Sequence, residues 1–327
     1  MIRIFCCPPA VLIALCIAWA APACADEPAP ETVVATLGKA TVEAAEVLHV
    51  VAKTPSGRDA DAETLPMLQA EVLELVIDRR LAAGQLTEQG YAVSKEEKEE
   101  LVSDLKRRLA AQGRSFEEFL DDEGLTEAAL RRQLVWDVIW GRYLENELTD
   151  EVLKREFDAH PREYDGTELR VSHILLRVED PAKHATVAEH AARLRAEISE
   201  GNQTFAEAAA KNSAGPSRRQ GGDLGFIPRH DRMPENFSLA AFALEKGEIS
   251  EPVTTRFGVH LIQCTDVKPG KKTWNEVRRA LVESLSRSLF AELALAGRKR
   301  IKIGYTGAMP YFEPGTKKLH TAKGSGQ

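Results

Sequence analysis

The spacing of apolar residues changes several times along this chain of 327 residues. Residues 31–42 alternate loosely between apolar and polar side chains, and Gly38 and Lys39 interrupt them, which predicts two short strands joined by a turn. Beyond a polar stretch at 54–62, apolar residues recur every three or four positions from Leu68 onwards, as they do on one face of a helix. This first part of the chain is therefore predicted to be mainly helical.

Short polar signals divide the helical part into separate helices. Ser94 followed by Glu97 is a capping-box pattern, in which each side chain binds the backbone N–H of the other residue. The same pattern recurs at Ser115 and Glu118. Apolar residues at helical spacing through 126–148 then predict one long helix.

The pattern changes again in the middle of the chain. Residues 169–178 and 258–267 are rich in β-branched and apolar side chains, which predicts two strands. Between them, helical spacing predicts helices at 187–198 and near 239–244. Together these elements predict a compact α+β unit over 167–268.

A second helical stretch follows this unit. Apolar residues recur every four positions through 274–300, and we expect a helix and a strand over 273–303. Because helices at the two ends of a chain commonly pack together, this segment is expected to rejoin the N-terminal region 26–160, with the unit 167–268 inserted between them. Residues 304–327 are polar and contain glycine, which predicts a disordered tail.

Composition narrows the class of protein. A hydrophobic fraction of 43% and a charged fraction of 28% are ordinary for a soluble globular protein. The net charge of -7 argues against a nucleic-acid partner. Four of the five cysteines lie at positions 6, 7, 16 and 24, so a chain that loses its N-terminal segment would keep only Cys264 and could form no internal disulfide.

The N-terminus has the three parts of a secretory signal peptide. Arg3 supplies a basic region, residues 10–20 are an apolar run, and 23–25 are small residues suited to cleavage. Removal of 1–25 would leave an exported chain in the periplasm or cell envelope, without a stable membrane span. Two alternatives stay open: the segment remains as an uncleaved anchor, or Cys24 carries a lipid.

Three short segments of the middle unit hold the candidate chemistry: 171–175 (VSHIL), 221–226 (GGDLGF) and 257–262 (FGVHLI). Each segment alone is a weak signal, because a histidine on an apolar strand is usually a core residue and paired glycines usually mark a turn. In this order they resemble the parvulin family of peptidyl-prolyl cis/trans isomerases. The resemblance implies an α+β domain, with a small antiparallel sheet and surrounding helices, inserted in an all-helical chaperone-like body.

The resemblance also implies roles for particular residues. The two facing histidines of the family correspond to His173 and His260, and a threonine near the second histidine corresponds to Thr255; these are the predicted catalytic residues. The side chains predicted to line a pocket for proline are Leu224, Met233, Phe237 and Phe257. No cofactor or metal is expected, because neither histidine has a cysteine or acidic partner at ligand spacing.

One position departs from the family pattern. The family places a Cys or Asp in the loop before GGDLG, and this chain has Ala214 there. An alanine cannot complete the electrostatic arrangement beside the twisting carbonyl, so we expect weakened but nonzero isomerase activity. Two other interpretations of the histidine pair stay open: a purely structural role, in which the imidazoles bond to each other, and a metal site.

The order of the predicted regions resembles the exported foldases of the SurA and PrsA group. Residues 33–40 resemble the N-terminal strand and turn of that group. The resemblance implies that the clients are unfolded or proline-containing exported polypeptides. Two functions stay open: an isomerase and folding chaperone, or a holdase chaperone whose parvulin domain binds clients with little or no catalysis.

Overall fold

The computed structural model describes residues 28–178, 180–230, 232–316 and 318–321. The predicted signal peptide and its cleavage site lie outside these residues. The chain divides into two compact units. The first unit contains the described residues up to Gln85, Val93–Trp136, and the described residues from Ala296 onwards; the second contains Leu86–Ala92 and Asp137–Leu295. Within the described ranges, no helix is long and apolar enough to cross a membrane.

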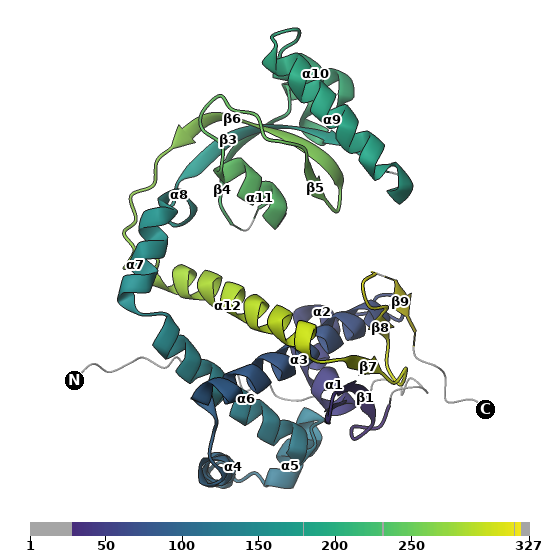
Figure 1. Ribbon diagram of the computed structural model, residues 1–327, viewed down its shortest axis with the longest axis vertical. Coiled ribbons are helices and arrows are strands. Elements are labelled where there is room, and N and C mark those ends of the chain that lie inside the picture. The colour runs from purple at the N-terminus through teal and green to yellow at the C-terminus, as the bar shows by residue number, and fades with distance from the viewer. Residues whose placement is uncertain (1–27, 179, 231, 317, 322–327) are drawn as a thin grey trace. The chain divides into compact units, whose positions relative to one another are not determined.

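Helices make up most of the first unit, and its strands come from both ends of the chain (Figure 1). Its elements are β1 (Val33–Leu37), β2 (Ala40–Glu43), α1 (Ala44–Lys53), α2 (Pro55–Arg58), α3 (Leu65–Leu86), α4 (Lys95–Ala111), α5 (Phe116–Glu123), β7 (Ile303–Tyr305), β8 (Tyr311–Phe312) and β9 (Leu319–His320). Two long helices, α6 (Glu127–Glu147) and α12 (Arg278–Arg300), contribute several residues to each unit, and α3 contributes its last residue, Leu86, to the second.

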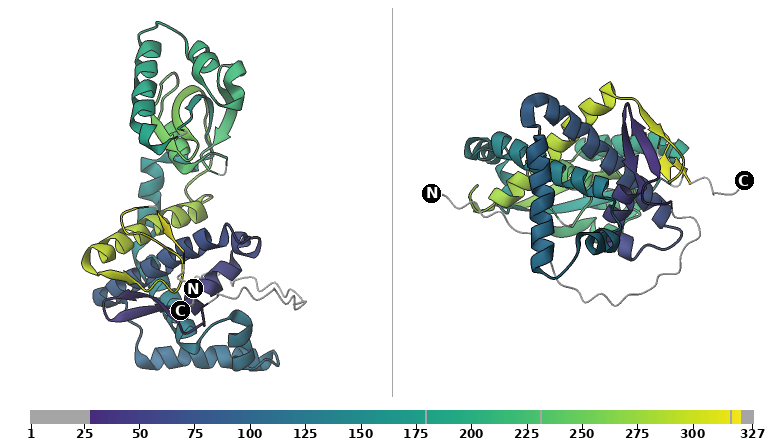
Figure 2. Two further views of the ribbon diagram at one scale, coloured as in Figure 1. Left: turned by 90° about the vertical axis from the view of Figure 1, so that its right-hand side faces the viewer. Right: turned by 90° about the horizontal axis from the view of Figure 1, so that it is seen from below.

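A three-stranded sheet joins the two ends of the chain in the first unit. β1 pairs antiparallel with β2 across a turn in which Gly38 has a φ of 61°, which confirms the predicted strand, turn and strand. The other edge of β1 pairs antiparallel with β7, so the strand order is β2-β1-β7. Figure 2 shows the purple N-terminal strands beside the yellow C-terminal segment. The sheet packs on α1 and α3 through buried residues such as Val34, Val47 and Ile77.

An ion-pair network ties the end of α12 to α3. The Arg298 guanidinium donates to Glu74 Oε2 at 2.7 Å and to Asp78 Oδ1 at 2.6 Å. The Tyr305 hydroxyl donates to Glu74 Oε1 at 2.6 Å. Gly297 lies on the contact side of α12, because a Cβ added there would come within 2.7 Å of the Leu81 side chain. The C-terminal segment thus contacts α3 through both charge and close packing.

The predicted helix starts in this unit are confirmed. Ser94 Oγ accepts from the Glu97 N–H, and the Glu97 carboxylate accepts from the Ser94 N–H, as a capping box requires. Ser115 and Glu118 repeat the arrangement at α5. The sequence analysis missed α1, which starts directly after β2, so no polar break separates the two elements.

The prediction of a disordered tail over 304–327 is wrong for its described part. β8 and β9 form an antiparallel hairpin, and Met309 is only 1% exposed in the core of the first unit. Tyr311 stacks on Tyr305 on one side and on His320 on the other, with ring centroids 4.7 and 5.0 Å apart. These few apolar and aromatic side chains supply the burial that orders the segment, although the composition around them is polar.

The second unit contains the predicted α+β domain and the helices next to it. Its elements are the single π-turn Thr87–Tyr91, α7 (Asp150–Ala159), α8 (Pro161–Tyr164), β3 (Glu168–Leu176), the 3₁₀ turns Pro181–Lys183 and Pro216–Gln220, α9 (His184–Ser199), α10 (Phe205–Asn212), β4 (Asp223–Pro228), α11 (Glu235–Phe242), β5 (Val253–Thr255) and β6 (Gly258–Lys268). The helix predicted near 239–244 therefore begins earlier, directly after Pro234.

A four-stranded antiparallel sheet in the order β4-β3-β6-β5 forms the centre of this domain. Figure 1 shows α9 and α10 over one face of the sheet and α11 at the other. Ile174 and Leu261 point to the face that α9 and α10 cover, whereas Val171 and Ile262 pack with α11. Side chains along a strand alternate between its faces, so the sheet has a buried cluster on each side.

Candidate active site

Strand alternation places the two predicted catalytic histidines on the face of the sheet that carries α11. His173 follows Val171 by two positions on β3, and His260 precedes Ile262 by two positions on β6. In the β3–β6 pairing, His173 lies opposite Ile262 and Leu175 lies opposite His260. The histidines are thus diagonal neighbours on adjacent strands, a separation that long side chains can span.

The two histidines and Thr255 form a hydrogen-bonded row. His173 Nδ1 lies 3.4 Å from His260 Nδ1, and His260 Nε2 lies 2.8 Å from Thr255 Oγ1. A neutral imidazole has one N–H and one acceptor nitrogen, so each bond fixes the tautomer of its neighbour. Two arrangements are possible: the Thr255 hydroxyl donates to His260, which donates to His173, or each of these bonds has the opposite direction. The structure therefore brings the three predicted catalytic residues together.

Burial keeps both imidazoles neutral. His173 is 5% exposed and His260 is 3% exposed. Burial lowers the pKa of His173, and burial together with the neighbouring His173 lowers the pKa of His260 to about 4. At neutral pH the row therefore carries no formal charge.

Phe237 closes the apolar side of the row. Its side chain is fully buried, and its ring meets His173 and His260 edge to face, with centroids 5.9 and 5.4 Å apart. Leu224 and Met233, which are both half-buried, pack against the same cluster. Three of the four residues predicted to line the proline pocket therefore belong to one apolar cluster, which reaches the histidines through Phe237.

The fourth pocket residue, Phe257, lies apart from this cluster. Its side chain is 51% exposed, and the Arg256 guanidinium sits 4.8 Å from its ring centroid. The Phe257 N–H donates to Thr255 Oγ1 at 3.1 Å, so the residue is joined to the site through its backbone. Its ring is open to solvent at the turn between β5 and β6.

Ala214 lies in the loop that borders the histidine row. Its N–H donates to the Leu175 carbonyl at 2.8 Å, and its side chain is exposed. The buried Ser213 hydroxyl accepts from the backbone N–H groups of Leu175 and Gly215, both at 3.1 Å, and so fixes the loop on β3. A Cβ at Gly215 would lie 2.9 Å from His173 Nε2, so the loop backbone rests directly on that imidazole.

The paired glycines of GGDLG allow the backbone to approach β3 closely. The Gly222 carbonyl accepts from the His173 N–H at 2.9 Å, and its φ is 84°. A Cβ at Gly222 would lie 2.4 Å from the His173 carbonyl oxygen, which is closer than any side chain permits. Glycine at this position therefore holds His173 at its place in the strand.

Two features that position the site were missed in the sequence analysis. His184 Nε2 lies 3.0 Å from Thr254 Oγ1, and the Asn236 amide donates to the Thr254 carbonyl at 3.3 Å, so both residues hold the short strand β5 that carries Thr255. Arg229 is 6% exposed and donates to Glu163 at 3.1 Å and Glu235 at 2.7 Å, which anchors the start of α11. Most of these contacts join elements that are remote in sequence, so no local pattern predicts them.

No group of three or more His, Cys, Asp or Glu side chains in the described ranges is arranged to hold a metal ion. Cys264 is a free thiol that is fully buried in the strand β6, and this burial raises its pKa. The site is thus a buried, uncharged cluster in which His173 Nε2 has no hydrogen-bond partner among the described residues.

A comparison with known families agrees with this geometry. Residues 173–266 match the family described as rotamase, PPIC-type PPIase domain. This segment of the chain is a PPIC-type peptidyl-prolyl isomerase domain. The match begins at one of the two histidines and extends past the other, so the isomerase domain contains the whole hydrogen-bonded row.

Relatives extend the similarity beyond the isomerase domain. The foldase protein PrsA of Clostridium acetobutylicum is 25% identical over 236 residues, which are 67% of this chain and 68% of that protein. A chaperone SurA of Alcanivorax borkumensis is 28% identical over 230 residues, which are 67% of this chain and 53% of that protein. The isomerase domain of this chain therefore belongs to a longer stretch that is similar to both.

A solved structure with a similar chain is a peptidylprolyl isomerase (PrsA) from Bacillus anthracis. It is 24% identical, and the match covers 70% of this chain and 96% of that chain. The TM-score of 0.39 is low.

Proposed function

We propose that this protein is a folding factor for exported polypeptides that accelerates the cis/trans isomerisation of X-Pro bonds. His173, His260 and Thr255 would form the polar side of the site, and Leu224, Met233 and Phe237 would grip the proline ring. The observation that supports this proposal is the neutral His–His–Thr row directly against the fully buried ring of Phe237. Phe257 would contact the client at the open edge of the site, because its ring is exposed.

Such a site needs no bond-breaking chemistry. The imide bond has partial double-bond character, and its rotation barrier is roughly 18–20 kcal/mol. A pocket that excludes water and holds the proline ring favours the twisted state, in which the carbonyl and the nitrogen have lost their resonance. The row would keep its hydrogen bonds while the client twists, since neither histidine changes its charge at neutral pH.

Ala214 supports a second candidate function, that of a holdase that binds clients with little or no catalysis. The exposed methyl group at this position offers neither charge nor hydrogen bond to a twisting carbonyl. A domain with this loop could still bind proline-containing segments in the apolar pocket. The two functions therefore differ in turnover and share client binding.

Export through the N-terminal segment is part of the proposal. The basic, apolar and small-residue parts of 1–25 support cleavage and a periplasmic or envelope location, with lipidation at Cys24 as the alternative. Mass spectrometry of the protein purified from its own cells distinguishes these outcomes. A mature chain starting near Asp26 supports cleavage, a lipid on Cys24 supports anchoring, and an intact Met1 contradicts both.

Proline-limited refolding of a denatured client tests the proposed function. The full chain is compared with a variant in which a short glycine–serine linker replaces residues 167–268. The excision is feasible because Glu168 pairs with Lys268 and the Gly270 N–H donates to Thr167 Oγ1 at 2.9 Å, so the two ends lie side by side.

Two readouts separate the candidates. If the isomerase function is right, the full chain accelerates the slow refolding phase and the linker variant does not. If both proteins suppress client aggregation equally while neither accelerates the slow phase, the holdase function is favoured. A chain that neither accelerates refolding nor suppresses aggregation contradicts both functions.

A further inference from the structure

The short helix α8 lies just outside the matched isomerase segment, between α7 and β3 (Figure 1). It starts at Pro161, which suits the first position of a helix because it has no backbone N–H to leave unpaired. Its last residue, Tyr164, is 7% exposed in a cluster with side chains of α7 and α12, and its hydroxyl lies 3.2 Å from Ser284 Oγ on α12. α8 is therefore packed on the helices that precede and follow the isomerase domain.

One buried arginine joins α8 to the start of α11. Arg229 is 6% exposed, and its Nε donates to Glu163 of α8 at 3.1 Å. The other two nitrogens of this guanidinium donate to both carboxylate oxygens of Glu235, the first residue of α11, at 2.7 and 3.2 Å. A planar guanidinium that bonds on two sides restricts both carboxylates. Arg229 thus fixes the first turn of α11 relative to α8.

The preceding residue of α8 contacts the other end of α11. The Arg162 guanidinium donates to the Leu244 carbonyl at 3.1 Å, two residues beyond Phe242, where α11 ends. It also donates to the Glu245 carboxylate at 2.8 Å. Two consecutive residues of α8 therefore act on both ends of a helix of eight residues.

α11 carries the apolar side of the candidate site. Phe237 is its third residue, and the ring centroid lies 5.9 Å from that of His173 and 5.4 Å from that of His260. Apolar packing of Phe237 and Ala241 on the sheet sets the depth of the helix, but such contacts are not directional. The hydrogen bonds at the two ends are directional, so they set where the helix lies along its own axis. A shift along this axis would move the Phe237 ring relative to both imidazoles.

We propose that Arg162 and Glu163 are positioning residues of the isomerase site. Together with Arg229 they hold α11, and therefore Phe237, in place against the histidine row, without touching the client. The inference rests on the proposed isomerase function, and it extends the functional unit beyond the matched segment 173–266 to a helix packed on α7 and α12. A displacement of α8 would then reach the pocket without any change in the residues that line it.

A purely structural role for the same contacts makes a different prediction. Contacts that only stabilise the domain change the fraction of folded protein. Contacts that position a side chain of the site change the rate per folded molecule, and a misplacement of about 1 Å can lower a rate by up to about a hundredfold. The rate of fully folded variants therefore separates the two roles.

The first measurement is the catalysed cis/trans exchange of a proline-containing peptide, with full-length variants that circular dichroism shows to be folded. Arg162→Ala, Glu163→Ala and the double variant remove the contacts of α8. Arg155→Ala and Asp158→Ala are the matched controls, because both residues are exposed on α7, directly before α8. Arg162→Lys is the conservative variant, since its ammonium can still donate to the Leu244 carbonyl.

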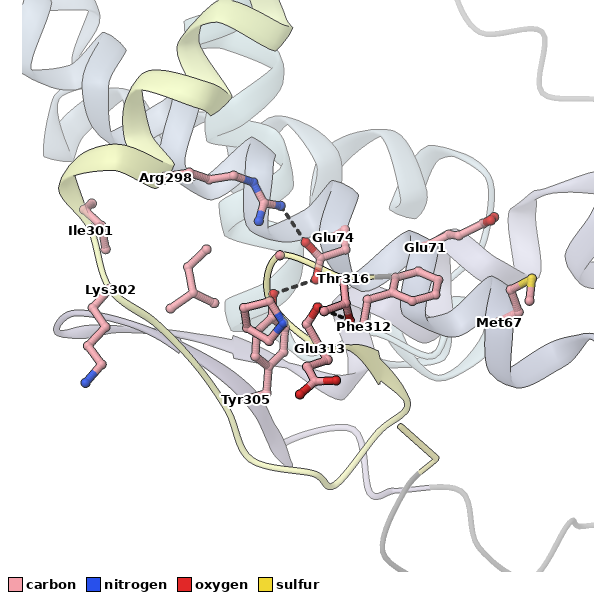
Figure 3. A pocket seen from close by; sticks show the side chains of 13 residues that line it. Met67, Glu71, Glu74, Arg298, Ile301, Lys302, Tyr305, Phe312, Glu313 and Thr316 are labelled. Carbon is pink, nitrogen blue, oxygen red and sulfur yellow. Dashed lines mark hydrogen bonds and ion pairs between the residues drawn. The ribbon is translucent and has the colours of Figure 1, made fainter. Parts of the chain in front are cut away.

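The second measurement follows the methionine methyl signals in NMR spectra of the same proteins. Met233 packs in the same apolar cluster as Phe237, so its methyl signal reports the position of the aromatic ring. Met67, which lines a pocket of the first unit (Figure 3), and Met309, in the core of that unit, provide reference signals remote from α8 in the fold.

We expect Arg162→Ala and Glu163→Ala each to lower the catalysed rate by at least about threefold, and the double variant by about tenfold or more. Arg162→Lys should lose less than Arg162→Ala, and the two controls should retain the wild-type rate. The Met233 signal should shift in all three alanine variants of α8, while the Met67 and Met309 signals stay in place. Unchanged rates in the folded α8 variants, equal losses in the controls, equal losses with lysine and alanine, or an unmoved Met233 signal would overturn the inference.

Failure of this inference is distinguishable from failure of the proposed function. A folded wild-type chain without any rate above the uncatalysed one refutes catalysis, and the Met233 signal then decides by itself whether α8 positions the pocket. A catalytically active wild type whose rate does not respond to the α8 variants refutes only the positioning role.

Discussion

Each unit of this protein has a polar cluster that joins segments distant in sequence, but the two clusters differ in charge. In the second unit, His173 and His260 are buried, neutral and bonded to each other. In the first unit, Arg298 bonds to the carboxylates of Glu74 and Asp78, and all three side chains remain partly exposed. Burial thus favours neutral, hydrogen-bonded groups, whereas partial exposure allows the ion pairs that join the two ends of the chain.

The largest expected effect is on the buried histidine site. Phe237→Ala should destabilise the isomerase domain by about 3–5 kcal/mol, because it leaves a cavity beside both imidazoles. Phe226→Ala on β4 is the matched control and should cost less than about 1 kcal/mol, since its ring is 36% exposed. Urea denaturation followed by circular dichroism measures both. Similar losses in the two variants would show that Phe237 is not a core residue.

The second effect tests the close approach of the glycine loop. Gly222→Ala should destabilise the domain by about 3 kcal/mol, because the new Cβ would collide with the His173 carbonyl and the left-handed backbone would be strained. Gly225→Ala, in the same motif with a φ of 70°, has open space around its Cβ and should cost only about 1 kcal/mol. Thermal unfolding compares the pair. An equal loss in both would mean that the contact with β3 is unimportant.

The third effect uses pH to charge the buried histidines. The pKa of His260 is about 4 in the folded chain, whereas an unfolded histidine titrates near 6.5, so the unfolded state binds protons first as pH falls. The free energy of unfolding of the isomerase domain should be constant above pH 6.5. It should fall by on the order of 2 kcal/mol towards pH 4, allowing for partial solvent screening.

Urea titrations at several pH values measure this loss. The double variant His173→Gln and His260→Gln lacks both titrating groups and should show a much smaller loss between pH 6.5 and pH 4.5. A wild-type stability that stays constant over this range would contradict the buried, neutral histidine pair.

The fourth effect belongs to the charged cluster. Arg298→Met should destabilise the first unit by about 1–2 kcal/mol, because Glu74 and Asp78 lose their shared cation. Arg107→Met on α4 is the control in the same unit: its pair with Asp104 is exposed and should contribute less than about 0.5 kcal/mol. Added salt screens the ion pairs, so it should reduce the difference in unfolding free energy between the two variants. If the two substitutions cost the same, the Arg298 network does not hold the C-terminal segment.

The smallest expected effect is on rate alone. Ala214→Asp should raise the isomerisation rate a few-fold without changing stability, because the side chain at this position is exposed and its backbone bond to Leu175 is unaffected. Isomerisation of a proline peptide is measured for both proteins, and Ala214→Ser serves as a polar, uncharged control. An unchanged rate with Asp would mean that a charge at this position does not reach the twisting bond.

Sequence patterns predicted the elements that depend on local periodicity. The apolar and β-branched runs at 169–178 and 258–267 predicted β3 and β6, and the serine capping boxes marked the starts of α4 and α5 correctly. The facing of His173 and His260 was implied by the family resemblance. Contacts across loops were not predictable, such as the bond of His184 to Thr254 that holds β5. The segment after residue 304 was mistaken for a disordered tail because a few aromatic side chains, spaced without a period, order it.

The most direct test of catalysis is the exchange rate between cis and trans forms of a proline-containing peptide, measured by NMR at pH 7.5 with the full chain. The account predicts a rate above that of the peptide alone, lost in Phe237→Ala under conditions where that variant is still folded. A rate equal to the uncatalysed one, from a folded wild-type chain, would contradict the proposal that this His–His–Thr row and apolar pocket twist X-Pro bonds.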